Sequence, residues 1–381
     1  MDLDLTEDQR ILKDSVTRFA QDLNAGAKER DRDGEFSREL WLRCGEQGLQ
    51  GLPVPQELGG SGLDPLSCSV ALEAFGYGCR DGGLSFSICA HLLACVIPIW
   101  KHGSKAQHER YLSGLCSGKI IAANAMTEPG TGSDAFAMTT RAVPDGDGFR
   151  LTGRKIFCSN GPIADLIVTY ALTDPSKGYH GGVTAFLVEK GTKGFAPGQK
   201  FEKLGLRTSL ISEMVFEDVL VPREAVVGQV GGGAPIFAQS MDWERALLGA
   251  CHIGTLQWLL EQATEYSRTR RQYGHPISKF QAISHKIADM KVRLEAARWL
   301  AYRAAWRLDR ARDAGLDASI AKVFVSESLV QSAMDLVQIL GGYGFTTEYE
   351  AERVLRDAIG STLYSGTSEI QRNIIARWLG L

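Results

Sequence analysis

Two segments of this chain combine hydroxyl, glycine and aromatic residues in a way that suits the binding of a flat, polar ring. Residues 127–134 read Thr-Glu-Pro-Gly-Thr-Gly-Ser-Asp, and the hydroxyls and glycine amides of such a loop can face a heteroaromatic ring or a phosphate. Residues 153–160 read Gly-Arg-Lys-Ile-Phe-Cys-Ser-Asn, and strand alternation would place Phe157 and Ser159 on one face. Taken singly, a capped turn and a core aromatic explain these residues equally well or better.

Two further segments carry groups that suit phosphates. Residues 268–276 read Arg-Thr-Arg-Arg-Gln-Tyr-Gly-His-Pro, with Gln281 shortly after. Three arginines in four residues can form a guanidinium fork for a diphosphate, although spacing alone favours a solvated helix end. Residues 341–344, Gly-Gly-Tyr-Gly, and residues 363–372, Leu-Tyr-Ser-Gly-Thr-Ser-Glu-Ile-Gln-Arg, are glycine-rich turns that expose backbone N–H groups beside a helix start.

Several common catalytic patterns are missing from the sequence. No Gly-x-Gly-x-x-Gly follows a strand and no Gly-x-x-x-x-Gly-Lys precedes a helix, which argues against a Rossmann or P-loop enzyme. Neither Gly-x-Ser-x-Gly nor His-Glu-x-x-His occurs. The eight cysteines occur singly and the seven histidines are scattered, so we expect no metal site and a reduced, cytoplasmic setting.

The charge balance also limits the classes of partner. The 381 residues include 42 Lys and Arg against 45 Asp and Glu, a net charge of −3, so no global basic field for nucleic acid is expected. No apolar run reaches about 18 residues, and we therefore expect no membrane span. The acidic start, Met-Asp-Leu-Asp-Leu-Thr-Glu-Asp, lacks the features of a signal peptide.

The hydrophobic pattern divides the chain into three parts. Residues 1–120 read as helical, with a run capped by Thr6 and buried helices over 66–75 and 92–100. Residues 121–230 read as a small antiparallel β domain, with strands over 166–172, 184–188 and 214–221. Residues 231–381 begin with a flexible glycine segment and read as helices over 234–266, 281–309, 319–340 and 367–378. This order predicts an α+β fold, mainly α, in which a β domain interrupts a helical bundle.

The four segments, taken together and in order, resemble the acyl-CoA dehydrogenase family of flavoproteins over essentially the whole chain. The resemblance implies an N-terminal helical domain, a middle antiparallel β domain and a C-terminal four-helix bundle. It implies FAD as the cofactor, lying between the middle and C-terminal domains and crossing a subunit interface. The chain is then expected to form a homotetramer or a homodimer.

The resemblance also assigns cofactor-binding positions, residue by residue. Those that line the flavin ring are Met126, Thr127, Gly132, Ser133, Phe157 and Ser159, and those after the last glycine turn are Thr367 and Glu369. Those that hold the diphosphate and adenosine from a neighbouring subunit are Arg270, Gln272, Tyr273, Gln281, Gln338, Gly341 and Gly342. Physical chemistry agrees, because Arg270 can neutralise a diphosphate and the two glycines let the backbone approach it.

The catalytic base is the point at which this sequence departs from many family members. They carry a carboxylate between the Tyr and Gly of the last motif, where this chain has Ser365, and a hydroxyl is too weak a base for an α-C–H. Isovaleryl-CoA and long-chain acyl-CoA dehydrogenases place their base on the long helix instead, and Glu244 falls on that position. An exposed Glu beside Arg245 is usually structural, but with Ser365 at the other site we expect Glu244 to be the base.

The implied reaction is an FAD-dependent α,β-dehydrogenation of a thioester. Glu244 would remove the α-proton while the β-hydride leaves to flavin N5, and the backbone N–H of Ser365 and a ribityl hydroxyl would hold the thioester carbonyl. Ser133, Asp242 and Arg245 are further candidates for substrate binding, although Arg245 also suits pairing with a carboxylate. Electrons would then pass to an external acceptor, either an electron-transferring flavoprotein or oxygen.

Several stretches favour a particular branch of the family. Residues 44–52, 74–79, 159–165, 241–245 and 365–368 look like the secondary-metabolism branch that includes prolyl-carrier-protein dehydrogenases. We therefore expect an acyl or aminoacyl thioester on a phosphopantetheinyl carrier protein rather than on CoA. The alternatives are an ordinary short or branched-chain acyl-CoA dehydrogenase, a flavin-dependent oxygenase on the same fold, and a non-catalytic FAD-binding assembly factor.

Overall fold

The computed structural model describes residues 4–308, 310 and 314–381. Its N-terminal part is helical, as predicted, and its helices are α1 (Glu7–Gln21), α2 (Ala27–Asp33), α3 (Arg38–Glu46), α4 (Pro65–Gly78), α5 (Gly82–His91), α6 (Ile97–His102), α7 (Lys105–Gln107) and α8 (Ser113–Cys116). Thr6 caps α1 as predicted, since its hydroxyl accepts from the backbone N–H of Gln9 at 3.2 Å. A π-helical segment, Leu92–Val96, joins α5 to α6 inside the predicted helix 92–100.

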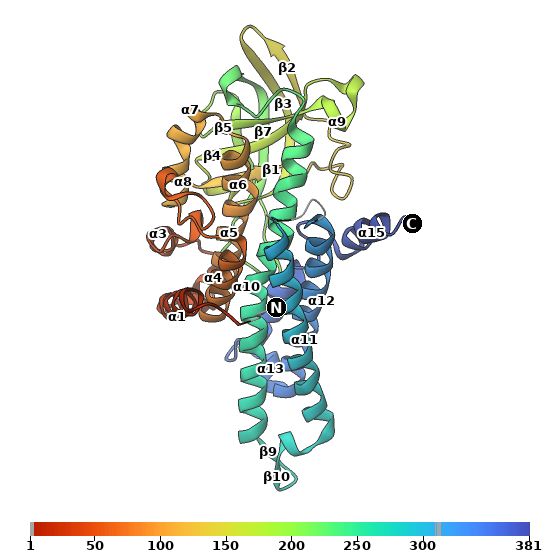
Figure 1. Cartoon of the computed structure of the whole chain (residues 1–381). Helices are drawn as coiled ribbons and strands as arrows, with labels where there is room; N and C mark the ends of the chain where they lie inside the picture. The colour runs from red at the N-terminus through yellow and green to blue at the C-terminus, as the bar shows by residue number, and fades with distance from the viewer. Residues whose placement is uncertain (1–3, 309, 311–313) are drawn as a thin grey trace.

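The middle part is one twisted sheet that caps one end of the helices (Figure 1). Its strands are β1 (Ala122–Ala125), β2 (Arg141–Asp145), β3 (Gly148–Ser159), β4 (Leu166–Leu172), β5 (Val183–Glu189), β6 (Phe195–Lys200), β7 (Ile211–Pro222) and β8 (Val226–Val227), with the short helix α9 (Tyr179–Gly182) before β5. The path runs β6-β7-β3-β2-β4-β5-β8, and most pairs are antiparallel as expected. Two pairings, β1–β4 and β2–β4, are parallel, so the sheet is mixed rather than purely antiparallel as predicted.

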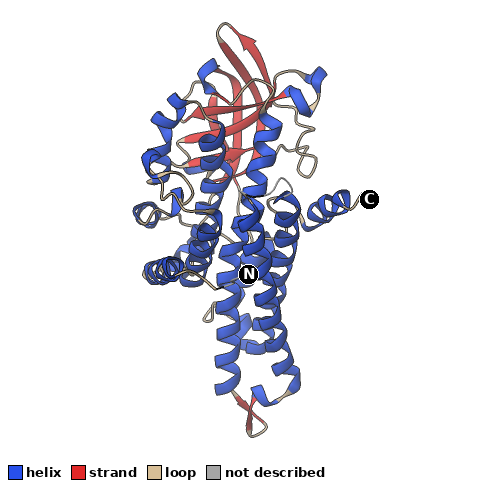
Figure 2. Cartoon of the chain, viewed as in Figure 1, coloured by secondary structure: helices blue, strands red, loops and turns tan. Residues whose placement is uncertain are grey.

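The C-terminal part is a bundle whose long helices run away from the sheet (Figure 2). It comprises α10 (Gly233–Thr269), the ribbon β9 (Arg271–Gln272) and β10 (His275–Pro276), α11 (Gln281–Arg307), α12 (Ala314–Leu340), α13 (Gly342–Phe345), α14 (Ala351–Gly360) and α15 (Ser368–Trp378). The first glycines of the predicted flexible segment end the loop, and Gly233 already begins α10. Asp309, the predicted end of the second long helix, and the first three residues of the chain lie outside the described residues.

The position of α10 against α4 depends on two glycines. A Cβ atom on Gly76 of α4 would lie 2.0 Å from the carbonyl oxygen of Cys251, and one on Gly254 of α10 would lie 2.1 Å from that of Glu73. Only glycine allows backbones to approach this closely. The contact fixes α10 against α4. It therefore also fixes the position of Glu244, which lies on α10, relative to the N-terminal helices.

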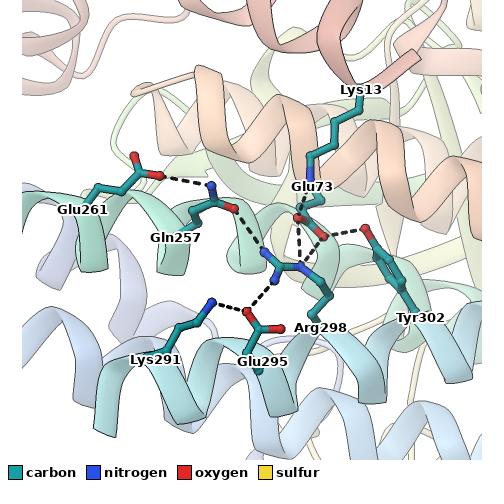
Figure 3. A network of polar contacts seen from close by, with 8 residues as sticks. All are labelled: Lys13, Glu73, Gln257, Glu261, Lys291, Glu295, Arg298 and Tyr302. Atoms are coloured by element: carbon teal, nitrogen blue, oxygen red, sulfur yellow. Dashed lines mark hydrogen bonds and ion pairs between the residues drawn. The ribbon is translucent and has the colours of Figure 1, made fainter. Parts of the chain in front are cut away.

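A network of charged and polar side chains joins the N-terminal helices to the bundle (Figure 3). The carboxylate of Glu73, 1% exposed, accepts hydrogen bonds from Lys13 of α1 at 3.2 Å and from Arg298 and Tyr302 of α11 at 3.2 and 2.8 Å. Charge-assisted hydrogen bonds of this kind offset the desolvation free energy that burying a carboxylate costs. Glu73 therefore connects three helices from opposite ends of the sequence.

Two helical segments are long and apolar enough, by length and composition alone, to cross a membrane. They are Gly82–His102, with mean hydropathy 1.8 and 83% of the window buried, and Ala314–Leu340, with 1.3 and 56%. Because both are packed inside this fold, the burial accounts for their composition, as in the core helices of other proteins. All eight cysteines are buried, and none of them forms a disulfide within the described residues.

Candidate active site

A cleft of about 590 Å³ lies where the sheet, α5, α10 and the turn before α15 meet. It collects nine of the residues proposed from the sequence, which come from four separate segments. They are Met126, Thr127, Gly132, Ser133, Phe157, Ser159, Glu244, Arg245 and Ser365. The fold therefore brings the predicted ring-binding residues and the predicted base into one site.

Glu244 stands on α10 at the wall of this cleft and is only 8% exposed. Its Oε1 accepts a hydrogen bond from the Oγ of Ser365. Burial raises the pKa of Glu244 above its usual value, and the Ser365 hydroxyl, Arg245 and Lys322 each offset part of that rise. A buried carboxylate with a raised pKa at the wall of a cleft is suited to proton transfer.

Ser365 lies in a tight turn whose backbone is held from two sides. Its φ of +58° falls in the left-handed region, which is uncommon for a residue other than glycine. The carbonyl oxygen of Ser365 accepts from Nε of Arg245 and from Nε2 of Gln371, both at 3.1 Å. Arg245 therefore fixes the turn that carries Ser365, a role that the sequence left open between substrate binding and pairing.

Asp242 does not line the cleft. Its Oδ1 lies 3.8 Å from Nη1 of Arg245, and the same side chain lies against Gly315 of α12. Burial raises the pKa of Asp242, while Arg245 lowers it in part. The geometry thus makes Asp242 a partner of Arg245 rather than a wall of the site.

Phe157 and Ser159 both line the cleft, as expected, but regular strand alternation does not place them there. The pairing of β3 with β7 shifts register between Lys155 and Cys158, and Phe157 has a φ of +55°. This bulge turns the Phe157 ring outward, 57% exposed, at the edge of the cleft. A strained backbone that presents an aromatic face to a cavity is typical of a binding site.

A buried ion pair beneath the bulge was not anticipated from the sequence. Nζ of Lys155 lies 2.9 Å from Oε1 of Glu128 and donates to the carbonyl oxygen of Met126 at 3.0 Å. Glu128 also accepts from the backbone N–H groups of Thr139 and Thr140, at 2.6 and 2.9 Å. The pair therefore ties the 126–134 loop to the bulge. The signal in the sequence that could have indicated this ion pair was Lys155, a charged residue beside apolar residues of a strand.

The residues proposed for the diphosphate and adenosine lie elsewhere. A second cleft of about 770 Å³, at the β9–β10 end of the bundle, is lined by Arg270, Gln272, Tyr273, Gly341 and Gly342. Arg270 follows α10 directly, 26 residues after Glu244, so these two residues lie roughly 39 Å apart along the helix axis. Gln281 and Gln338 line neither cleft and are exposed nearby on α11 and α12.

Thr367 and Glu369 stand at the start of α15. The hydroxyl of Thr367 accepts from the backbone N–H of Ile370 and caps the helix, and Glu369 is exposed in the first turn. Neither lines the cleft. Gln371, which the sequence did not single out, is the residue of this helix that bonds to the Ser365 turn, through two carbonyl oxygens.

Two basic side chains around the cleft were not singled out from the sequence. Lys322 of α12 is 6% exposed, and its Nζ has no hydrogen-bond partner among the described residues. Burial lowers the pKa of Lys322 to about 8, and the charge of Arg245 adds to that effect. His252 of α10 bonds to the hydroxyl of Tyr364 at 2.9 Å, and burial lowers its pKa to about 4, which leaves it neutral.

Comparison with known proteins identifies the family. Family models described as the N-terminal, middle and C-terminal domains of acyl-CoA dehydrogenase match residues 6–119, 123–219 and 231–380. The chain belongs to the acyl-CoA dehydrogenase family.

Individual relatives lie in the branch suggested by the sequence. An L-prolyl-[peptidyl-carrier protein] dehydrogenase of Serratia sp. is 44% identical over 100% of this chain and 99% of its own length. A protein of the same name from Pseudomonas fluorescens is 44% identical over 95% of each chain. The solved structure titled "PigA with FAD and proline" is 44% identical, with a TM-score of 0.98 and complete coverage of both chains. These findings confirm the predicted family, fold class and enzyme class, an FAD-dependent acyl-thioester dehydrogenase.

The residues present fit the expected cofactor. A Cβ atom added to Gly132 would meet nothing within 4 Å, so the loop offers open space beside the exposed Phe157 ring. At the second cleft, Gly341 and Gly342 are equally unobstructed, and the guanidinium of Arg270 lies 5.9 Å from the centre of the Tyr343 ring. A planar ring suits the first surface, and a diphosphate suits the cation and open backbone of the second.

Proposed function

We propose that this protein oxidises the α,β-bond of an aminoacyl thioester carried on a phosphopantetheinyl carrier protein. The observation that carries the proposal is a buried carboxylate, Glu244, placed in the cleft that also holds the ring-binding residues. The 44% identity to two proteins named L-prolyl-[peptidyl-carrier protein] dehydrogenases, over nearly the full chain, supports the choice of substrate class.

Glu244 acts as the base that accepts the α-proton. Its burial disfavours the charged form, so proton transfer to it is easier than to an exposed carboxylate. Ser365, Arg245 and Lys322 each favour the ionised form of Glu244, which is the form that accepts the proton. The balance between these effects places the working range of the base above the ordinary carboxylate range.

The turn at Ser365 serves the thioester carbonyl. We assign the backbone N–H of Ser365 as a donor to this oxygen, where it would stabilise enolate character as the proton leaves. The left-handed conformation of the turn and its two supports, Arg245 and Gln371, keep that donor in place before substrate arrives.

FAD, when bound, supplies the acceptor for the hydride that leaves the β-carbon. We propose that Met126, Thr127, Gly132, Ser133, Phe157 and Ser159 hold its ring, with Thr367 and Glu369 at the start of α15. Arg270, Gln272, Tyr273, Gln281, Gln338, Gly341 and Gly342 would hold its diphosphate and adenosine in the cleft of a neighbouring copy. The separation of the two clefts along α10 supports this assignment, since one chain holds them far apart.

Further parts of the proposal follow from the same arrangement. The enzyme is a homotetramer or homodimer, divided into domains at about residues 120 and 230. Its electrons leave to an external acceptor, an electron-transferring flavoprotein or oxygen. A cytoplasmic location is supported by the eight buried cysteines, none of which forms a disulfide within the described residues, because oxidising compartments favour disulfides.

One experiment tests substrate and mechanism together. The purified holoenzyme is mixed anaerobically with acyl and aminoacyl thioesters, each on CoA and on carrier protein, and loss of the oxidised flavin absorbance is followed. We expect bleaching with an aminoacyl group on carrier protein and none with Glu244→Gln, although that variant still binds FAD and substrate. Bleaching by acyl-CoA thioesters alone would identify an ordinary acyl-CoA dehydrogenase, and a stable oxygenated flavin would identify an oxygenase. Absence of bleaching by every thioester would contradict the enzyme proposal.

A further inference from the structure

The groove between α5 and α10 continues beyond the cleft into a small cavity of about 50 Å³. On α10, the residues that line the cleft end at Arg245, and those that line the cavity begin at Leu248. On α5 the order is reversed, because Gly82 lines the cavity and Ala90 lines the cleft. The cavity therefore lies next to the cleft, further along α10 from the sheet (Figure 1).

Phe86 of α5 is the one described residue that lines both spaces. Its ring packs against the ring of Tyr364, with 4.6 Å between the ring centres and 39° between the planes. Tyr364 lines the cleft, and its hydroxyl shares a hydrogen bond of 2.9 Å with Nε2 of His252, a residue of the cavity wall. The two rings therefore stand between the cleft and the cavity, and Tyr364 is held in place from the cavity side.

The cavity wall next to Phe86 is suited to hydrocarbon. Cys89 lies one turn after Phe86 on α5, and its Sγ is 3.6 Å from the Sγ of Cys251 on α10. Leu248 is 5% exposed and lines the cavity one turn before Cys251. A buried thiol packs as a small apolar group, so these three side chains form an apolar surface.

The charged residues of the cavity lining are already bonded to the protein. The guanidinium of Arg80 donates to the carbonyl oxygen of Gly76 at 3.0 Å, and the carboxyl group of Asp357 accepts from the backbone N–H of Leu206. These groups therefore do not depend on a ligand for a hydrogen bond. A ligand group that reached the cavity would gain apolar contacts there.

The base of the proposed function, on which this inference rests, stands one helical turn from the cavity. Glu244 lies four residues before Leu248 on α10, so the two side chains share a face and lie about 6 Å apart. An acyl group whose α-carbon faces Glu244 can extend along the groove toward Leu248. Its far end then meets the ring of Phe86, because this ring separates the cleft from the cavity.

We propose that Phe86, held by Tyr364, sets the upper limit on the length of the acyl group. A compact group, such as a small ring or a butyryl chain, ends before the Phe86 ring. A longer straight chain would have to displace this ring from its contact with Tyr364, and forcing extra methylenes into a packed site is unfavourable. Phe86 is thus a specificity-determining residue, and the cavity behind it is space that a longer chain can use once the ring is removed.

The test measures how well butyryl and octanoyl thioesters compete with anaerobic bleaching by the aminoacyl thioester that the wild type oxidises fastest, all on one carrier protein. Competition detects a chain that enters the cleft even when it is not oxidised. In the wild-type holoenzyme, octanoyl should compete at least about 100-fold less well than butyryl, since a single methylene can be discriminated by about 10–200-fold. In Phe86→Ala the two should compete within about 10-fold of each other, because the cleft and the cavity become one space.

Further variants separate loss of the Phe86 ring from a general loosening of the cleft. Phe237→Ala is the matched control, since Phe237 is an aromatic wall of the cleft that does not line the cavity, and it should gain no competition by octanoyl. Adding Leu248→Phe to Phe86→Ala refills the cavity and should weaken octanoyl competition again by about 10-fold, while butyryl competes as before. If Phe86→Ala does not fold, Phe86→Leu removes the ring more conservatively and should show a smaller gain in the same direction.

The outcomes separate this inference from the function on which it rests. Equal competition by both chains in the wild type, or an unchanged ratio in Phe86→Ala and Phe86→Leu, would overturn the role of Phe86 and leave the proposed function standing. A gain that persists after Leu248→Phe is added would show that the longer chain takes another path, which also contradicts the inference. If no aminoacyl thioester bleaches the wild type, the proposed function fails, and this inference fails with it.

Discussion

The hydroxyl of Ser365 donates a hydrogen bond to the carboxylate of Glu244. The two residues are 121 positions apart, one in the turn before α15 and the other on α10. The family resemblance places the base of many members at the Ser365 position, and we propose that Glu244, on the helix that faces this position, serves as the base in this chain. The hydrogen bond shows that the two positions meet at one point. This contact supports the proposal that a carboxylate on α10 can act at the place where other family members use the turn before α15.

Ser365→Ala should move the acid limb of the pH–rate profile to higher pH. The Ser365 hydroxyl lowers the pKa of Glu244, so its removal raises that pKa further and leaves less of the ionised base at a given pH. A hydrogen bond to a charged group contributes about 1.5–3 kcal/mol, which corresponds to a shift of about 1–2 pH units. The rate of anaerobic bleaching measured from pH 5 to 9 gives the shift.

The control for this variant is Ser365→Asn, because Asn keeps a hydrogen-bond donor in the turn and tolerates the left-handed conformation of this position. If the acid limb of Ser365→Ala coincides with that of the wild type, the hydrogen bond does not govern the base. The FAD content of both variants should stay unchanged, because the Ser365 turn is held through its backbone carbonyl.

Lys322→Met should slow catalysis and stabilise the fold. The buried ammonium lowers the pKa of Glu244, so its loss also moves the acid limb upward. Burial lowers the pKa of Lys322 from 10.5 to about 8. Below pH 8 the buried charge therefore lowers the free energy of unfolding, and this free energy increases as pH rises from 8 toward 10.5. Removing an unpaired buried group should raise the unfolding free energy at pH 7 by about 1–3 kcal/mol.

Urea unfolding at pH 7 and 9.5 and the bleaching profile check this prediction. The wild type should change rate near pH 8 as Lys322 loses its proton, and Lys322→Met should not. Lys291→Met, an exposed lysine paired with Glu295, is the control and should change neither measurement. A variant that loses stability equally at both pH values would show that Lys322 acts by packing.

The helices and strands could be predicted from local sequence patterns, whereas the contacts that hold the site residues in place could not. Strand 166–172 has its observed bounds because a continuous apolar run between turns is a local signal. The bulge at Phe157 depends on the pairing of β3 with β7, and the bond from Ser365 to Glu244 joins distant segments. A local pattern of residues in the sequence does not indicate contacts between such distant segments. Lys322 looked like an ordinary helical lysine, since only the packing of α12 on α10 buries it.

Glu128→Gln should destabilise the protein and weaken FAD binding. Burial alone would raise the pKa of Glu128, but Lys155, Thr139 and Thr140 outweigh it and lower the pKa to about 2. Its stabilisation is therefore complete above about pH 4.5 and is lost as pH falls toward 2. Breaking one side of a buried pair costs about 3–5 kcal/mol at pH 7.

The measurement is urea unfolding at pH 7 and at pH 3, with FAD affinity by fluorescence. The difference between wild type and variant should shrink at pH 3. Adding Lys155→Met to Glu128→Gln should restore part of the stability, because it removes the ammonium left unpaired. A double variant less stable than Glu128→Gln would contradict this account.

Arg270→Ala should weaken FAD binding at a cleft that the neighbouring copy completes. Alone, the variant should purify with little FAD, and Glu244→Gln should purify with FAD but without activity. In a co-expressed hybrid, an Arg270→Ala subunit keeps its own Glu244 and borrows Arg270 from the other copy. Mixed assemblies should then recover about a quarter of wild-type activity if the two chains pair at random in dimers. No recovery would show that Arg270 serves the cleft of its own chain.

Glu73→Gln should lower stability without changing the chemistry of the cleft. Glu73 is 1% exposed and meets Lys13, Arg298 and Tyr302, so loss of its charge leaves the cations of α1 and α11 without their buried partner (Figure 3). We expect a loss of about 3–5 kcal/mol and a clear fall in Tm. Glu261 belongs to the same network but is exposed, so Glu261→Gln is the matched control and should cost less than about 1 kcal/mol.

Bleaching by the proposed substrate should stay within about twofold of wild type in both variants, because α10 is held against α4 by backbone contacts at Gly76 and Gly254 as well. If Glu73→Gln instead slows bleaching while its stability is unchanged, the network positions Glu244 rather than holding the helices together.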